Sequence, residues 1–477
     1  MAATALLLLG AVSFGPAAAS AIASDAQNGI VTDVASTATP RVIGGQCYGG
    51  LANGTLCRKI SSMVKIGNWI YAGGIIDVVG DNNGGNERSG FSNLMRFDAT
   101  TKALDPTFKP QLYRTAGTVS DGAVDGLAAS TDGSTLYVGG EFSTASSGPG
   151  APGVVRKGVA AFTAATGALK TTFTPTVCSG GGPCNVYDLR VIGSSLWVGG
   201  DFTKIAGQSR GALASLDPVS GALTSAVTIP FSGRAVPTTA TKIIKIKANP
   251  AGTKAVILGN FTVAGGQTRE EVAMLNVDAA SGAATSVASW YSPTAFHQAV
   301  VSCSTKHYWP RDIDWSPTGD TFVIVGTGGG HAHPYPAPCD AFTKWADNNS
   351  STAVPVLYNH TNIDTIGSVC NIGAYSYVGG HFKNLNQEVR RNGVKITPPA
   401  GTANEVHYGF GVIDNSSGLA VSNWNHSDQT GRGEGWLAVL CVPGSAATGG
   451  GVYYGGDSIG VNGNPQVQRL AYFAARS

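Results

Sequence analysis

Two histidines lie two residues apart in a segment rich in Gly and Pro, and their spacing suits metal binding. His331 and His333 belong to the run GGGHAHPYPAPCD, which ends near Cys339 and Asp340. A transition metal needs three or four converging donors, and a His-x-His pair supplies two of them. The alternative is a polar loop whose imidazoles only hydrogen-bond to the backbone. The pair is a candidate metal site to be weighed against that simpler interpretation.

A second candidate is a loop rich in side-chain oxygen, DVVGDNNGGNE, which contains Asp77 and Asp81. Calcium is bound by carboxylate and amide oxygens of this kind, so calcium is a candidate cofactor here. The spacing does not match an EF-hand. Clusters of Asp, Asn and Gly are also ordinary turn formers, which is the competing interpretation.

Three further carboxylates, Asp125, Asp188 and Asp312, sit at or near the start of short apolar runs. If the fold brings these runs to one centre, a ring of carboxylates there could bind a cation or a ligand, or serve acid–base chemistry. The alternative is that each carboxylate caps its strand and bonds to neighbouring backbone.

Aromatic residues cluster around one of these runs, and Trp309 is the member that we expect to be exposed. Aromatic rings with polar neighbours hold sugars by stacking and hydrogen bonding, so Trp309 is a candidate ligand contact, although most strand aromatics lie in a core. The motif H-E-x-x-H does not occur, and the sequence assigns no catalytic residue.

The even number of cysteines indicates disulfides in an oxidising compartment. Spacing suggests the local pairs Cys47–Cys57 and Cys178–Cys184, and we expect Cys303–Cys339 and Cys370–Cys441 for the rest. Residues 1–23 contain a short apolar run followed by Ala-x-Ala spacing, as in an export signal. The sequence therefore predicts a secreted protein, extracellular or at the cell surface.

An apolar run that ends in Gly-Gly or a close variant recurs at intervals of roughly 60 residues. The first glycine of each copy is Gly73, Gly139, Gly199, Gly259, Gly326, Gly379 or Gly455. Each copy is flanked by short apolar runs and tight polar turns, a pattern typical of strands, and helical periodicity is nearly absent. Four strands in each of seven units predict an all-β, seven-bladed β-propeller. Two stacked β-sandwiches would not give one motif at seven near-even intervals.

The last unit ends at its third strand, RLAYF. We expect an N-terminal strand over residues 39–44 (TPRVIG) to supply the missing edge and close the ring. The predicted organisation is a signal peptide at 1–23, the closing strand and a disulfide loop at 24–58, and the propeller at 59–477.

The repeats YVGGEF, WVGGDF and YVGGHF, with the loops GQSR and GGQTR, resemble the delta-60 β-propeller repeat. The stretches PRDIDWSPTGD and CDAFTKW are similar to those of secreted actinobacterial members. The resemblance spans most of the chain after residue 23 and implies the propeller fold and export. It implies no reaction and no catalytic residues.

The net charge argues against nucleic-acid binding, and the lengths of the loops indicate which face of the fold binds a ligand. The 31 Lys and Arg residues against 29 Asp and Glu residues leave a formal charge of +2, which gives no electrostatic footprint for nucleic acid, and we expect no membrane span. The long inserts follow the second strand of a unit or link two units, so in a propeller they share one face. We predict a monomeric binding or adhesion module for an extracellular polysaccharide or protein. The alternatives are a carbohydrate-active hydrolase or lyase with its site at the channel mouth, and a structural cell-envelope protein.

Overall fold

The computed structural model describes residues 30–44, 57–81, 86–114, 122–178, 184–297, 303, 307–328, 335–361, 364–422, 424, 435–458, 460–461, 464 and 466–476. Nearly all regular structure in these residues is β-strand, which confirms the all-β prediction. The exceptions are the one-turn helix α1 (Pro293–Phe296) and the 3-10 turn Ala446–Thr448. The described residues include no helix with the length and hydropathy of a membrane span.

Seven antiparallel sheets in the described residues share one strand order, with the first strand of each repeat innermost. The innermost strands are β2 (Lys59–Ile66), β8 (Ala123–Ala129), β13 (Val186–Ile192), β19 (Lys242–Ala248), β25 (Trp309–Trp315), β29 (Ile366–Ile372) and β36 (Trp436–Val442). The second strands, which carry the repeated glycines, are β3 (Trp69–Ile75), β9 (Thr135–Glu141), β14 (Ser195–Gly200), β20 (Lys254–Asn260), β26 (Thr321–Thr327), β30 (Tyr375–Gly380) and β37 (Gly451–Gly456). The third strands are β6 (Leu94–Asp98), β12 (Val159–Thr163), β17 (Leu213–Leu216), β23 (Val272–Asp278), β27 (Ala341–Ala346), β35 (Phe410–Asp414) and β38 (Leu470–Ala474).

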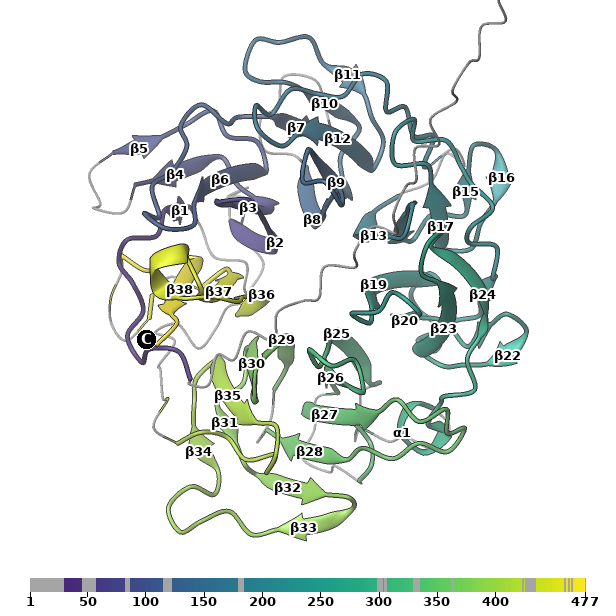
Figure 1. The fold of residues 1–477 in the computed structure, drawn as a ribbon, viewed down its shortest axis with the longest axis vertical. Helices are drawn as coiled ribbons and strands as arrows, with labels where there is room; N and C mark the ends of the chain where they lie inside the picture. The colour runs from purple at the N-terminus through teal and green to yellow at the C-terminus, as the bar shows by residue number, and fades with distance from the viewer. Residues whose placement is uncertain are drawn as a thin grey trace, which may run out of the picture.

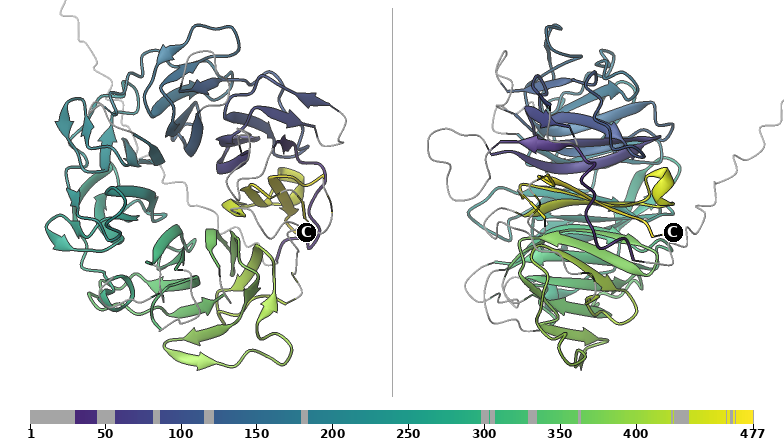
Figure 2. Two further views of the ribbon diagram at one scale, coloured as in Figure 1. Left: turned by 180° about the vertical axis from the view of Figure 1, so that it is seen from behind. Right: turned by 90° about the vertical axis from the view of Figure 1, so that its left-hand side faces the viewer.

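These sheets surround a central axis in the manner of a β-propeller (Figure 1). Each innermost strand contacts those of the two neighbouring sheets, in the order β2, β8, β13, β19, β25, β29 and β36, and β36 contacts β2. Figure 2 shows the ring from behind and from the side. The first strands of all the repeats therefore meet at the axis.

The fourth, outermost strand is the least regular part of the repeat. It is complete in two sheets, as β24 (Ala283–Val287) and β28 (Leu357–His360). In four other sheets it is reduced to one bridge to the third strand, at Leu104, Leu169, Leu223 or Ala420. The prediction of four strands per unit thus holds fully for only part of the ring.

The structure also contains short strands that do not belong to this four-strand pattern. They are β1 (Arg41–Ile43), β4 (Val78–Gly80), β5 (Glu87–Arg88), β7 (Gln111–Tyr113), β10 (Thr144–Ser146), β11 (Val154–Val155), β15 (Lys204–Ile205), β16 (Gln208–Ser209), β18 (Phe231–Ser232), β21 (Val263–Ala264), β22 (Gln267–Thr268), β31 (Asn384–Leu385), β32 (Glu388–Arg391), β33 (Val394–Ile396) and β34 (Glu405–Val406). The hairpin β32–β33 pairs with β28 and widens its sheet to six strands.

The hydrophobic core lies between neighbouring sheets. Ile66 and Tyr71 of one sheet pack with Leu127 and Val138 of the next. The same arrangement joins Ile60 to Tyr453, from the first and last repeats. Because the second strand of each sheet is covered on both faces, it is buried along nearly its whole length, as in β9 and β14, unlike the strands of a sheet with one face in water.

The predicted closing strand lies elsewhere. Arg41–Ile43 forms strand β1, but it pairs with β4 of the first repeat and not with β38. The backbone bonds to β38 come from farther upstream, because Thr32 N donates to Ala474 O at 2.8 Å and Ser36 N donates to Tyr472 O at 2.8 Å. The strand pattern of TPRVIG was recognised correctly, but such a pattern does not identify the partner.

Three predicted disulfides are confirmed, namely Cys178–Cys184, Cys303–Cys339 and Cys370–Cys441. Cys57 is also disulfide-bonded, and its predicted partner Cys47 lies outside the described residues. Cys178–Cys184 immediately precedes β13, and Cys303–Cys339 joins the segments before β25 and β27. Both therefore lie at the end of the ring where the innermost strands begin.

Candidate functional site

Every innermost strand contains one register shift against its second strand. The shift leaves one residue without a direct partner, and such a bulge turns a side chain away from the regular alternation. The seven residues are Ser61, Asp125, Tyr187, Ile244, Arg311, Gly367 and Leu437. All seven line one cavity on the axis.

The repeated glycines explain why the shift recurs. A Cβ placed on Gly140 would lie 2.1 Å from the carbonyl oxygen of Ala123, and one on Gly74 would lie 1.9 Å from that of Lys59. The glycine that pairs with the residue before the bulge is the second of the motif in five copies and Gly259 or Gly326 in the other two, and it gives the innermost strand room to bulge. The sequence motif and the cavity lining are consequences of the same local geometry.

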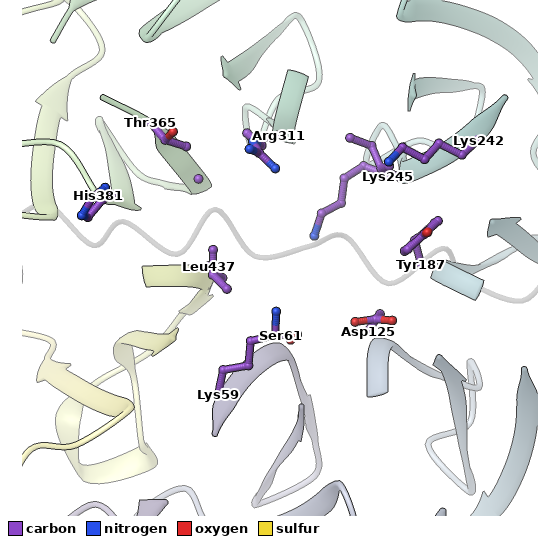
Figure 3. A pocket seen from close by; sticks show the side chains of 12 residues that line it. Lys59, Ser61, Asp125, Tyr187, Lys242, Lys245, Arg311, Thr365, His381 and Leu437 are labelled. Atoms are coloured by element: carbon purple, nitrogen blue, oxygen red, sulfur yellow. The ribbon is translucent and has the colours of Figure 1, made fainter. Parts of the chain in front are cut away.

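The cavity has a volume of about 500 Å³ and is mainly cationic. The side chains that the bulges present are joined by Lys59, Lys242, Lys245, Thr365 and His381 (Figure 3). Among these lining residues, four lysines and arginines face one carboxylate, that of Asp125. With His381 neutral, the lining has a formal excess of three positive charges.

Neighbouring side chains change the electrostatic environment of two of these cations, Lys245 and Lys242. Lys245 Nζ lies 3.6 Å from Asp312 Oδ1, so this charge is partly balanced. Lys242 Nζ lies 5.0 Å from the ring centre of Trp309 and 5.7 Å from that of Tyr187. Burial, and then the positive charge of Arg311, lower the pKa of Lys242, whereas Asp201 acts more weakly in the opposite direction.

Tyr187 is a hydrogen-bonding group and not a base at neutral pH. Its hydroxyl donates to Asp201 Oδ2 at 3.1 Å. Burial raises the pKa of Tyr187 to about 12, with further contributions from Asp201 and Asp125. His381 Nδ1, at the same cavity, lies 3.0 Å from Asp364 Oδ2.

The structure separates the three predicted carboxylates. Asp125 is a bulge residue and lines the cavity. Asp188 and Asp312 are buried, and they accept hydrogen bonds from Ile246 N at 2.8 Å and Val369 N at 3.0 Å on the next innermost strand. These two residues join neighbouring sheets, so no ring of three carboxylates forms.

Trp309 is partly buried and not exposed as predicted, and it begins β25 at the register position that Lys59 and Lys242 hold on their own strands, although it is not among the residues that line the cavity. Its contact with Lys242 places it beside the cationic lining. The role of Trp309 as a ligand contact stays a prediction.

Of the predicted metal ligands, Asp77 and Asp81 lie within the described residues, and each bonds to a different side chain. Asp77 forms an ion pair with Arg58, in which Nε donates to Oδ1 at 2.6 Å and Nη2 bonds to Oδ2. Asp81 instead accepts bonds from Asn86 N and Nδ2 at 3.3 and 3.0 Å. His331 and His333 lie outside the described residues, within which no group of three or more His, Cys, Asp and Glu side chains is placed to hold a metal.

The comparisons with known proteins do not assign this chain to a family. No protein-family model matches the chain, and no curated protein matches it. One similar solved structure is the extracellular domain of a B. thetaiotaomicron protein classed as a hybrid two component system, with 11% identity and a TM-score of 0.46. That match covers 91% of this chain and 43% of the other. A second is the β-propeller domain of Cps50 (Swd1) from Myceliophteria thermophila, with 8% identity and a TM-score of 0.44, covering 91% of this chain and all of that one. At this level of similarity, function has to be argued from the chain's own residues.

Proposed function

We propose that this chain is a secreted, seven-bladed β-propeller that acts as a binding module for an extracellular polysaccharide or protein. The observation that carries the proposal is the axial cavity, to which all seven innermost strands contribute a side chain or backbone at their bulges. A rigid ring that presents converging polar groups binds with little cost of ordering them. Disulfides support an oxidising, extracellular location.

The loops near the cavity support the same function. Disulfides Cys178–Cys184 and Cys303–Cys339 hold segments at the end where the innermost strands begin. Loops fixed to a rigid scaffold commonly carry binding residues. A ligand at the cavity would therefore also meet cross-linked loops.

The cavity chemistry favours retention over turnover. Glycoside hydrolysis generally requires two carboxyl groups at the reacting bond. Among the described lining residues, Asp125 supplies the only carboxylate, and the raised pKa keeps Tyr187 protonated. The hydrolase alternative thus has weaker support than the binding module.

An array of extracellular polysaccharides and matrix proteins, probed with the full chain, tests the proposal. We expect retention of one ligand class with no release of shorter sugars when the same ligands are incubated with the protein. Release of products would favour the enzyme, whereas no retention on any surface would contradict the binding module. Lys204→Met is a suitable control, because Lys204 is exposed on β15 at the outer edge of the ring (Figure 1).

A further inference from the structure

The positive charge of the axial cavity indicates which class of ligand the cavity binds. This inference rests on the binding function proposed above. Lys59, Lys242 and Arg311 come from three different innermost strands and line one space (Figure 3). Lys245 also lines it but lies near Asp312. Setting that pair aside, three cations face Asp125, so the lining retains a positive excess.

The fold holds like charges together at this place. Burial and then the positive charge of Arg311 lower the pKa of Lys242, while Asp201 opposes them. Bringing two cations together in a partly desolvated space is unfavourable, and a bound anion would offset that repulsion. Guanidinium groups such as that of Arg311 pair well with planar or tetrahedral oxyanions, since they donate two parallel hydrogen bonds.

Aromatic side chains stand beside the same cations. Trp309 and Tyr187 both lie within cation–π distance of Lys242 Nζ. An aromatic face next to a cation suits a ligand that has an apolar ring face and an anionic substituent. Acidic sugars have both features, whereas an acidic peptide offers carboxylates without a ring face.

We propose that the axial cavity binds a saccharide that carries carboxylate or sulfate groups. Arg311 and Lys242, on the neighbouring strands β25 and β19, contact an anionic group, Lys59 adds positive charge from the opposite side of the cavity (Figure 3), and Trp309 packs against a sugar ring. Asp125 opposes anions on its own side of the cavity and so restricts where the charged group lies.

Calorimetric titration of the full chain tests this with four probes: tetragalacturonic acid, a heparin tetrasaccharide, neutral cellotetraose and a hexaglutamate peptide. We expect one of the two acidic saccharides to bind at least about tenfold more tightly than the other two probes, and added salt to weaken that binding. The carboxylate and sulfate probes separate the two sources of the anion.

Substitutions locate the site. Arg311→Gln and Lys242→Met should each weaken binding by about tenfold or more, the effect of losing one charged hydrogen bond. Lys204→Met should leave it unchanged, and unfolding curves confirm that each variant is folded. Trp309→Ala should weaken binding of the saccharide without altering its dependence on salt.

The results distinguish a failure of the acidic-saccharide inference from a failure of the proposed binding function. If polysaccharide is retained on the array but cellotetraose binds as well as the acidic sugars, the binding module stands and the acidic ligand is wrong. Failure of both acidic probes to bind also overturns the inference, while the array decides the module independently. Equal binding of hexaglutamate would replace the saccharide with a peptide.

Discussion

Arg96 is a buried cation that joins two repeats. Its guanidinium lies 4.3 Å from the ring centre of Trp69 and 4.6 Å from that of Phe108. It donates to Asp105 at 2.9 and 2.6 Å, and to the carbonyl oxygen of Ala164 in the next sheet at 2.7 Å. The residue combines packing, an ion pair and a bond between sheets.

Replacing Arg96 by Met should therefore be strongly destabilising. The methionine keeps part of the packing but leaves the Asp105 carboxylate buried without its cation, which costs about 3–5 kcal/mol. Urea unfolding measures the loss. Arg88→Met, at an exposed position, should change the free energy of unfolding by less than about 0.5 kcal/mol, and equal effects of the two changes would refute the role of the ion pair.

The burial of Lys102 leads us to predict that the free energy of unfolding rises with pH. It is 3% exposed, and its ammonium lies 3.6 Å from the ring centre of Tyr472. Burial lowers its pKa from 10.5 to about 8, against the opposing charge of Asp98. Between pH 8 and 10.5 the unfolded chain holds the proton that the folded chain has lost, so stability rises with pH in this window.

The measurement is the free energy of unfolding of the protein and of Lys102→Met at pH 7.5 and 9.5. Over this interval the protein should gain about 2 kcal/mol relative to the variant, which lacks the titrating group. Staying below pH 10 avoids ordinary tyrosine titration. A difference that stays constant would show that the pKa of Lys102 is not depressed by burial.

At the scale of the strands, the glycine repeat predicted the sheets well, but of the three predicted carboxylates only Asp125 lines the cavity. Asp125 and Asp188 occupy similar places in the sequence pattern, yet Asp125 is the bulge residue and Asp188 follows its bulge. One residue of offset turns a side chain from the axis to the sheet interface. Strict alternation therefore could not reveal Lys242 or Arg311 as lining residues.

A usable signal was nevertheless present. In each motif the glycine that pairs with the residue before the bulge, such as Gly74, Gly140 or Gly259, marks the bulge, because its missing side chain leaves room for the innermost strand's carbonyl. Aligning the first strands on these glycines would have identified the lining positions. The partner of the N-terminal strand was less accessible, since nothing in TPRVIG distinguishes β4 from β38.

Gly140→Ala tests this explanation of the motif. The added methyl group would lie 2.1 Å from the Ala123 oxygen and 3.0 Å from Val124 Cα, both backbone atoms that cannot move independently. We expect a loss of about 2–3 kcal/mol, measured by denaturant unfolding. Gly148→Ala is the matched control, because its Cβ would meet only an ordinary contact at 3.7 Å. If both variants are equally stable, the motif needs another explanation.

At the scale of the whole molecule, the first and last repeats are joined by several independent contacts. Ile60 of β2 packs in one cluster with Tyr453 of β37. The buried guanidinium of Arg469 donates to the carbonyl oxygens of Arg58 at 2.8 Å and Val42 at 2.7 Å. Cys370–Cys441 links the innermost strands of the last two sheets. These contacts favour a ring in which no sheet can leave without disturbing both neighbours.

The segment before Ala38 covers the edge of the last sheet. Beyond its two backbone bonds to β38, Val31 is fully buried and its N–H donates to the Tyr377 hydroxyl at 3.0 Å. Trp424 Nε1 donates to Thr32 O at 3.0 Å. This segment therefore connects the last two sheets and protects an edge strand that could otherwise pair with another chain.

Removing residues 1–38 should destabilise the protein and promote association. The buried valine and two backbone hydrogen bonds together suggest a loss of about 3–5 kcal/mol. Calorimetry and size-exclusion chromatography would detect the lower unfolding temperature and the new oligomers. Val31→Asp should reproduce much of the loss in the full chain, whereas Val34→Asp, at a position 71% exposed, should not. A truncated protein that remains monomeric and equally stable would show that β38 needs no covering strand, and ring closure would then have to depend on Arg469 and the core between the first and last sheets.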